Sequence, residues 1–221
     1  VRDCDYALLE HPDGYKILIS EADLADYPCM FLKSTGNNGM HALFPKCPVR
    51  FEDDNDYKLE IVEEAPYIAK TSGERNFPWR FFVIAKHEKT LVENEMVYKL
   101  SASCELEDYS WVTPGKSSWE WWNPSLYNVG FRVGSNTQTY KYYVDFAANM
   151  GLEYMLMDGA WMAAASDPWT PNPEINLPEV IQYAMQRNVK VLLWLSWLTV
   201  EKHFDQLFAR YAMAGISGLP T

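Results

Sequence analysis

The sequence lacks basic runs and any stripe of lysine or arginine: 19 basic residues stand against 30 acidic ones, and the net charge is −11. Nucleic acids and anionic membrane surfaces are therefore poor partners. No stretch approaches the roughly 18 apolar residues that a membrane span needs. No signal-peptide pattern is visible at Val1, which fits a mature protein, a cytosolic protein or an internal piece of a longer chain.

Cysteine is also scarce, and none of the four cysteines has the CxxC or Cys–His spacing of a zinc site; they are Cys4, Cys29, Cys47 and Cys104. One or two disulfides in an exported protein, or buried free thiols, fit the sequence equally well. The sequence has no GxGxxG or GxxxxGK[ST] run after a strand, and no GxSxG run. A nucleotide-binding domain and a serine hydrolase are therefore unsupported.

The first half of the chain, up to about residue 112, has the pattern of β-strands separated by turns. In "YKILIS", Tyr15, Ile17 and Ile19 alternate on one face, and "YKLEIVE", "PWRFFVIAK" and "ENEMVYKLS" follow as further strands. Strands joined without helices predict a β-sandwich or a large antiparallel sheet.

The second half, from about residue 115, alternates strands with helices. Strands are predicted around 118–123, over "LEYMLMD" ending at Asp158, and over "VKVLLWLSW". Helices are predicted near 138–150, with Asn136 or Thr137 as cap and Gly151 at the end, and from Asn176, where Glu179 gives a capping-box-like pattern. A third amphipathic helix is marked by Phe204, Leu207, Phe208 and Tyr211.

Three βα units predict the opening of a TIM barrel or of a doubly wound sheet, and the missing nucleotide-binding runs favour the barrel. Because a barrel needs eight units, the C-terminus looks truncated. The remaining units would come from the same chain or from another one.

Aromatic and acidic residues gather where these strands end, at the side of a barrel that carries ligand-binding sites. Glu120 and Trp121 lie at the end of the first predicted strand, and Asp158 and Trp161 lie at and just after the end of the second. Flat rings stack on sugar faces while carboxylates bind hydroxyls, so this pattern indicates carbohydrate binding. The alternatives are that Trp119 and Trp121 pack in the core or under a helix and that Asp158 caps a loop. Trp194 lies inside an apolar run, which favours the core.

The segment "ISEADLADYP" holds the carboxylates of Glu21, Asp23 and Asp26 at the end of a predicted strand. A solvated loop is one interpretation. The other is that one of these carboxylates binds a calcium ion, which takes oxygen ligands.

Several of these runs occur in an order that resembles glycoside hydrolase family 97, the bacterial exo-acting α-glucosidases and α-galactosidases. The runs are "ISEADLADYPCMFL", "PWRFFVIA", "TPGKSSWEWWN", "NTQTYKYYVDFAANMGLEYMLMDGAW" and "INLPEVIQYAMQRNVKVLLWLSW". The resemblance implies that 1–112 are part of an N-terminal β-super-sandwich. It also implies that 113–221 form the first three βα units of a catalytic (β/α)8 barrel.

Residue by residue, the resemblance implies that Glu21 of "SEADL" is a calcium ligand and that Glu120, Trp121, Asp158 and Trp161 bind an oligosaccharide substrate. The catalytic carboxylates and further calcium ligands are expected beyond residue 221. Such an enzyme would be periplasmic or secreted. The alternative function is a non-catalytic carbohydrate-binding protein, or an inactive fragment of such an enzyme.

Overall fold

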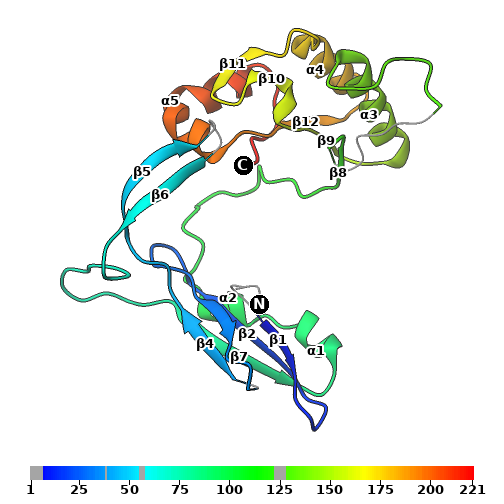
Figure 1. The fold of residues 1–221 in the computed structure, drawn as a ribbon. Coiled ribbons are helices and arrows are strands. Elements are labelled where there is room, and N and C mark those ends of the chain that lie inside the picture. Colours follow the sequence, from blue (N-terminus) through cyan, green and yellow to red (C-terminus); the bar gives the residue numbers. More distant parts are fainter. Residues whose placement is uncertain (1–6, 38, 55–57, 122–127) are drawn as a thin grey trace. The chain divides into compact units, whose positions relative to one another are not determined.

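The structure is a computed structural model that describes residues 7–37, 39–54, 58–121 and 128–221. It divides the chain into two compact units (Figure 1). The first comprises Val1–Phe51 with Ile61–Tyr109, and the second comprises Glu52–Glu60 with Ser110–Thr221. The domain boundary predicted between residues 112 and 113 stays a prediction. Within the described residues, no helix is long and apolar enough to cross a membrane.

The first unit contains an antiparallel sheet in the order β1-β2-β7, formed by Ala7–Glu10, Lys16–Ala22 and Trp79–Ala85. A tight turn joins the first two strands, and the positive φ of Gly14 (+82°) suits glycine there. Ile19 is buried and Ile17 packs beside it, whereas Tyr15 precedes β2 and is exposed. The predicted alternation on one face is therefore right for the two isoleucines.

Two further strand pairs belong to the β-rich part of the chain. β3 (Phe31–Ser34) and β4 (Met40–Leu43) pair antiparallel, and β5 (Pro48–Asp54) pairs with β6 (Lys58–Glu64). Buried Met30 and Leu32 pack with Ile19 in a small core. The predicted antiparallel β region is thus confirmed, while its arrangement as a sandwich stays a prediction.

Two short helices, α1 (Glu88–Val92) and α2 (Met96–Leu100), follow β7. The strand predicted over "ENEMVYKLS" is therefore wrong. Met96 and Leu100 are four residues apart, which is a helical spacing, and Asn94 Oδ1 accepts a hydrogen bond from the Met96 N–H at the start of the turn. Methionine, lysine and leucine in this run are all good helix formers, which agrees with the helix.

The second unit contains a parallel sheet in the order β12-β9-β8, from Lys190–Leu193, Tyr154–Met157 and Ser117–Trp119. Helix α3 (Thr137–Met150) connects β8 to β9, and α4 (Leu177–Met185) lies between β9 and β12. Helix α5 (Trp197–Met213) follows β12, and a parallel bridge then joins Leu192 to Gly218. Successive strands are thus neighbours, as the βα prediction requires, whereas the complete barrel stays a prediction.

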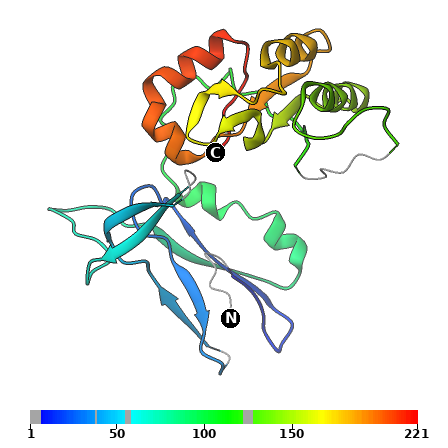
Figure 2. The same ribbon diagram turned by 45° about the horizontal axis from the view of Figure 1, so that its top comes forward.

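Between β9 and α4 the chain makes a short 3₁₀ turn, Gly159–Trp161, and a hairpin of β10 (Met162–Ala164) and β11 (Asp167–Pro171). Figure 2 shows this yellow hairpin beside the orange-red α5. The Thr199 hydroxyl of α5 donates to the Ala165 carbonyl at 2.7 Å, and the Tyr211 hydroxyl donates to the Pro168 carbonyl. The turn side of the hairpin is therefore bonded to the first and the last turn of α5.

The predicted boundaries of α3 are confirmed by its caps. The Asn136 side chain accepts a hydrogen bond from the Thr139 N–H at 3.0 Å, and Gly151 ends the helix with φ +66°. The expected apolar face is buried; it comprises Tyr140, Tyr143, Val144 and Ala147. These residues pack over the sheet in the large core of the second unit.

The start of α4 is also as predicted, but its capping box is only half formed. Asn176 accepts from the Glu179 N–H at 3.3 Å, whereas the Glu179 carboxylate pairs with Lys141 of α3. The Asn176 N–H donates to the Thr137 hydroxyl instead of to Glu179. The reciprocal bond is therefore replaced by two contacts between α3 and α4.

The third predicted helix exists, but half of its predicted apolar face is wrong. Leu207 and Tyr211 are buried, whereas Phe204 and Phe208 are 59% and 44% exposed and contact each other with ring centroids 5.1 Å apart. The backbone of His203 leaves the helical region (φ −124°), so one continuous helical face does not run through α5. The strand predicted over "VKVLLWLSW" also ends early, because Ser196 caps α5.

Candidate functional site

A pocket of about 600 Å³ opens in the second unit beyond the carboxyl ends of β8, β9 and β12. Its lining includes Glu120 and Trp121 after β8, Asp158 after β9 and Trp194 after β12. Helix α3 and the loop before it supply the rest of the wall. The structure thus brings together three of the predicted substrate-binding residues, namely Glu120, Trp121 and Asp158.

Glu120 is held in this pocket through one of its two carboxylate oxygens. Its Oε1 accepts hydrogen bonds from the Tyr140 hydroxyl at 2.8 Å and from the Asp158 N–H at 2.9 Å. Its Oε2 is buried and has no hydrogen-bond partner among the described residues. Burial raises the pKa of Glu120, and the two hydrogen bonds to Oε1 oppose that rise. One carboxylate oxygen is therefore held in place, and the other retains its capacity to accept.

Asp158, in contrast, has both carboxylate oxygens engaged. Oδ2 accepts from the Trp119 indole N–H at 2.8 Å, and Oδ1 accepts from the Gly159 N–H at 2.6 Å. The second bond caps the 3₁₀ turn, so the loop-capping alternative is right for this residue. Asp158 lines the pocket and at the same time fixes the orientation of the Trp119 ring.

Aromatic rings form much of the wall around these carboxylates. The Trp119 and Trp121 rings lie with centroids 5.4 Å apart at 31°, and Trp121 is 61% exposed. Trp194 lines the pocket as well, although its position in an apolar run had favoured the core. A Cβ added to Gly159 would lie 3.1 Å from the Trp194 ring, so glycine permits this close approach.

Trp161 is the predicted substrate-binding residue that does not line the pocket. It is 0% exposed, and its indole N–H donates to the Trp194 carbonyl at 2.8 Å. Its ring packs edge-on against Tyr211 at 5.7 Å. In this structure Trp161 belongs to the core and supports the segment that carries Trp194. A direct contact with sugar stays a prediction that would require exposure of the ring.

Tyr140 was missed as a site residue because sequence periodicity placed it on the buried face of α3. It is fully buried, yet its hydroxyl bonds Glu120, and burial raises its pKa so that it stays a donor. Loop residues 133–135 were missed as well. The sequence marks these three residues only weakly, because Gly134 is the one whose residue type favours an unusual backbone conformation; its φ is +152°.

Glu21, the predicted calcium ligand, lies in the first unit on β2. It faces Arg80 of β7 in the sheet register, and its Oε1 is 3.0 Å from Arg80 Nε. Its Oε2 accepts the Met30 N–H, and the side chain is only 5% exposed. Asp23 and Asp26 make separate contacts, with the Ala102 N–H and with Arg75.

These contacts fit a calcium ion poorly. Calcium takes six to eight oxygen ligands, but the described residues contain no group of three or more His, Cys, Asp or Glu side chains placed to hold a metal. Glu21 already has a cationic partner. The described residues thus do not form a calcium site by themselves. The described cysteines, Cys29, Cys47 and Cys104, are unbridged in this structure, and Cys4 lies outside the described residues.

The fold and the pocket define an α/β unit with an aromatic, acidic cleft at its strand ends, preceded by an antiparallel β unit. Comparison with known proteins agrees with this class. Residues 4–102 match the family described as Glycosyl-hydrolase 97 N-terminal, and residues 119–221 match Glycoside hydrolase 97. The two matches together span most of the chain, which therefore belongs to glycoside hydrolase family 97.

Individual relatives are longer than this chain. It is 38% identical over 212 residues to a retaining alpha-galactosidase of Bacteroides thetaiotaomicron, covering 93% of this chain and 32% of that protein. It is 30% identical over 145 residues to a probable retaining alpha-galactosidase of Streptomyces bingchenggensis, covering 63% and 21%. A family 97 enzyme from a Pseudoalteromonas species, solved with acarbose, matches with a TM-score of 0.68 and 25% identity over 96% of this chain and 32% of that one. The chain thus spans a third or less of these relatives.

Proposed function

We propose that this chain forms the sugar-binding part of an α-glycosidase that hydrolyses terminal α-galactosyl or α-glucosyl residues of oligosaccharides. One observation carries the proposal. The buried Oε2 atom of Glu120 has no hydrogen-bond partner among the described residues, and it belongs to a pocket whose lining includes tryptophan rings. A sugar hydroxyl can donate a hydrogen bond to that oxygen, and the flat C–H face of the same sugar can stack on a tryptophan ring.

Within the pocket the residues have different tasks. Trp121, the exposed ring of the Trp119–Trp121 pair, stacks against the sugar face. Glu120 accepts a sugar hydroxyl through Oε2, while Tyr140 and the Asp158 N–H hold Oε1 still. Asp158 shapes the wall, since both of its oxygens are already bonded. A position held in advance loses less entropy when the ligand binds.

Hydrolysis itself needs two carboxyl groups in acid, base or nucleophile roles. Both oxygens of Asp158 already accept hydrogen bonds, and Glu120 is positioned to accept one from the sugar. We therefore place the catalytic pair beyond residue 221 of the complete enzyme. The names of the two relatives, a retaining alpha-galactosidase and a probable retaining alpha-galactosidase, support retention of configuration and a galactosyl substrate. The other barrel units, in the same or another chain, would close the pocket.

Calcium dependence belongs to the proposal only for the complete enzyme, and we derive no catalytic step from it. Glu21 would have to exchange Arg80 for the ion, with further ligands from outside the described residues. Chelation with EGTA should then lower the melting temperature of the complete enzyme but not that of its Glu21→Gln variant. Equal melting temperatures with and without chelator in both proteins would remove calcium from the proposal. A periplasmic or secreted location is proposed from the resemblance, and cell fractionation tests it.

The test of sugar binding uses the pocket tryptophans as reporters. Titration with methyl α-D-galactopyranoside or methyl α-D-glucopyranoside should change the intrinsic fluorescence of the chain. Glu120→Gln replaces the acceptor at Oε2 with an amide and should raise Kd about 10-fold or more, because a hydrogen bond to a charged group contributes about 1.5–3 kcal/mol. Glu201→Gln, an exposed residue of α5 outside the pocket lining, is the charge-matched control and should leave Kd unchanged.

Turnover of an aryl α-galactoside separates the two functional alternatives. The complete enzyme should hydrolyse it, whereas a carbohydrate-binding protein should bind the sugar without turnover. Absence of any fluorescence response to both glycosides would reject the proposed pocket altogether.

A further inference from the structure

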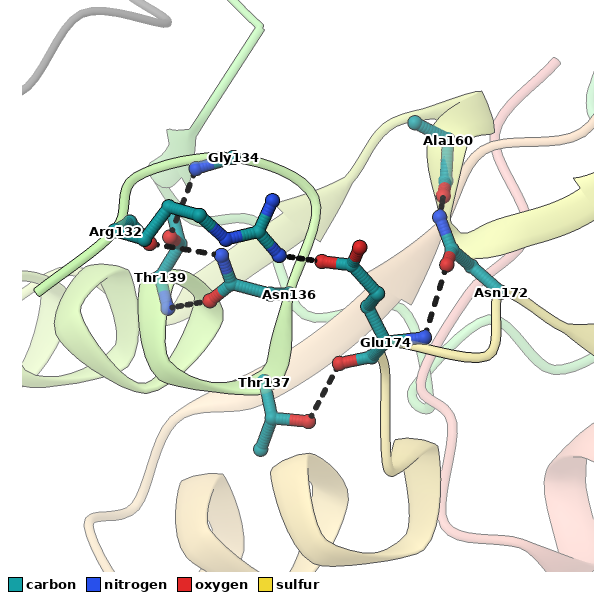
Figure 3. A network of polar contacts seen from close by, with 8 residues as sticks. All are labelled: Arg132, Gly134, Asn136, Thr137, Thr139, Ala160, Asn172 and Glu174. Carbon is teal, nitrogen blue, oxygen red and sulfur yellow. Dashed lines mark hydrogen bonds and ion pairs between the residues drawn. The ribbon is translucent and has the colours of Figure 1, made fainter.

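Figure 3 shows a network of polar contacts in the second unit. It joins the loop before α3, which includes Arg132 and Gly134, to the loop before α4, which includes Asn172 and Glu174. Of the eight residues labelled in Figure 3, only Gly134, Thr139 and Ala160 line the pocket themselves.

Asn172 is bonded through every polar group it has. Its Nδ2 donates to the Ala160 carbonyl at 3.1 Å, and its Oδ1 accepts from the Glu174 N–H at 3.0 Å. Its backbone N–H donates to the Trp161 carbonyl at 2.8 Å, and its carbonyl accepts from the Ile175 N–H at 2.8 Å. Asn172 thereby ties the loop before α4 to the Gly159–Trp161 turn, whose Ala160 forms one wall of the pocket.

Thr137 makes the corresponding connection on the side of α3. Its N–H and its hydroxyl both donate to the Glu174 carbonyl, at 3.1 and 3.2 Å, and the hydroxyl also accepts from the Asn176 N–H at 2.8 Å. The carboxylate of Glu174 pairs with Arg132 as well. That ion pair is solvent-exposed and contributes little, so the bonds to backbone groups carry most of the connection.

The network continues from Arg132 into the second wall of the pocket. Asn136 Nδ2 donates to the Arg132 carbonyl at 2.9 Å, and the Gly134 N–H donates to the Thr139 hydroxyl at 3.2 Å. Residues Val133, Gly134 and Ser135 between these contacts line the pocket. Both walls, 133–135 and Ala160, are thus held by one set of hydrogen bonds, and Asn172, Thr137 and Glu174 at its centre lie outside the pocket lining.

We propose that Asn172 and Thr137 are positioning residues that set the distance between these two walls and hence the affinity of the pocket for a pyranoside. This inference rests on the proposed sugar-binding function. Neither side chain lines the pocket, so any effect on affinity must pass through the walls that they hold.

Asn172→Asp tests the contact with Ala160. The variant keeps the acceptor for the Glu174 N–H but replaces the Nδ2 donor with an oxygen that repels the Ala160 carbonyl. At a temperature well below unfolding, we expect Kd for methyl α-D-galactopyranoside to rise three- to tenfold. Gln186→Glu makes the same amide-to-acid change at an exposed position after α4 and should leave Kd unchanged.

Thr137→Val provides a second test if Asn172→Asp does not fold. It keeps the shape of threonine but removes the hydroxyl that bonds Glu174 and Asn176, and Kd should rise at least threefold. Thr137→Ser, which keeps that hydroxyl, should restore most of the affinity. A purely structural role would shift the melting temperature without separating valine from serine in Kd.

The outcomes distinguish the two proposals. If the unmodified chain binds the glycoside and Asn172→Asp and Thr137→Val bind it equally well, the positioning role is wrong and the sugar pocket stands. If the unmodified chain binds neither glycoside, the proposed function fails, and the positioning role fails with it.

Discussion

Replacement of Tyr140 by phenylalanine tests the link between the core and the pocket most sharply. The change removes the hydroxyl that donates to Glu120 Oε1 at 2.8 Å and leaves the rest of a fully buried ring in place. Glu120 then keeps only the Asp158 N–H on Oε1, while Oε2 has no partner among the described residues. Loss of a hydrogen bond to a buried charged group costs about 1.5–3 kcal/mol.

We therefore expect Tyr140→Phe to lower the free energy of unfolding by about 1.5–3 kcal/mol at pH 7. This corresponds to a fall of roughly 6–12 °C in the melting temperature of the second unit. Lower pH should reduce the loss, because a protonated Glu120 needs fewer donors. Urea unfolding followed by tryptophan fluorescence at pH 7 and at pH 5 measures both effects.

Tyr183→Phe is the matched control. Its hydroxyl also donates to a carboxylate, that of Asp145, at 2.9 and 3.0 Å, but that carboxylate is partly solvated and keeps its ion pair with Arg187. We expect a loss below about 1 kcal/mol and no change in sugar affinity. Equal losses in the two variants, or a loss below about 0.5 kcal/mol in Tyr140→Phe, would refute the reasoning about Glu120.

Three further predictions concern the cap, the pocket wall and pH. Asn136→Ala removes the cap of α3 and should cost about 1 kcal/mol in urea unfolding. Gly159→Ala should displace the Trp194 ring, which a shifted fluorescence maximum of the free chain would reveal. It should also weaken glycoside binding, which a fluorescence titration would measure as a higher Kd. Burial raises the folded-state pKa of Glu120, so its contribution to stability is full below the unfolded value near 4.5 and is lost as pH rises through the folded pKa. Relative to Glu120→Gln, the unmodified chain should therefore gain stability as pH falls from 8 to 5, as parallel unfolding curves would show.

Local signals were enough to predict helices α3 and α4 of the second unit. Asn136 and Gly151 mark the two ends of α3, and Asn176 marks the start of α4, because caps depend on bonds within a single turn. The same kind of signal misled the prediction at "ENEMVYKLS", where a short run fits a strand or a helix equally well until its spacing is weighed.

Features that depend on distant contacts could not be predicted in this way. The break at His203 exposes Phe204 and Phe208, although their spacing suits a buried face. Trp161 was predicted to bind substrate, but the turn after β9 buries its ring. Trp194 was favoured as a core residue, but at the end of β12 it lines the pocket. Which ring faces a ligand is decided by the packing of neighbouring strands, and one-dimensional patterns do not carry that information.

The "NTQTYKYY" run shows how a short sequence serves several contacts at once. Asn136 caps α3, Thr137 bonds Glu174, Thr139 bonds Gly134 and Tyr140 bonds Glu120. Four side chains of one helical turn therefore stabilise the helix, hold the loops and orient the pocket carboxylate. This explains physically why a run that resembles family 97 lies at the edge of the candidate site.

Diffraction from crystals soaked with methyl α-D-galactopyranoside tests the role of Glu120 most directly. We predict a pyranoside in the pocket, with its apolar face on Trp121 and a hydroxyl oxygen about 2.5–3.0 Å from Glu120 Oε2. A sugar that binds elsewhere, or one that lies in the pocket without contacting Oε2, would contradict the proposed function of this carboxylate.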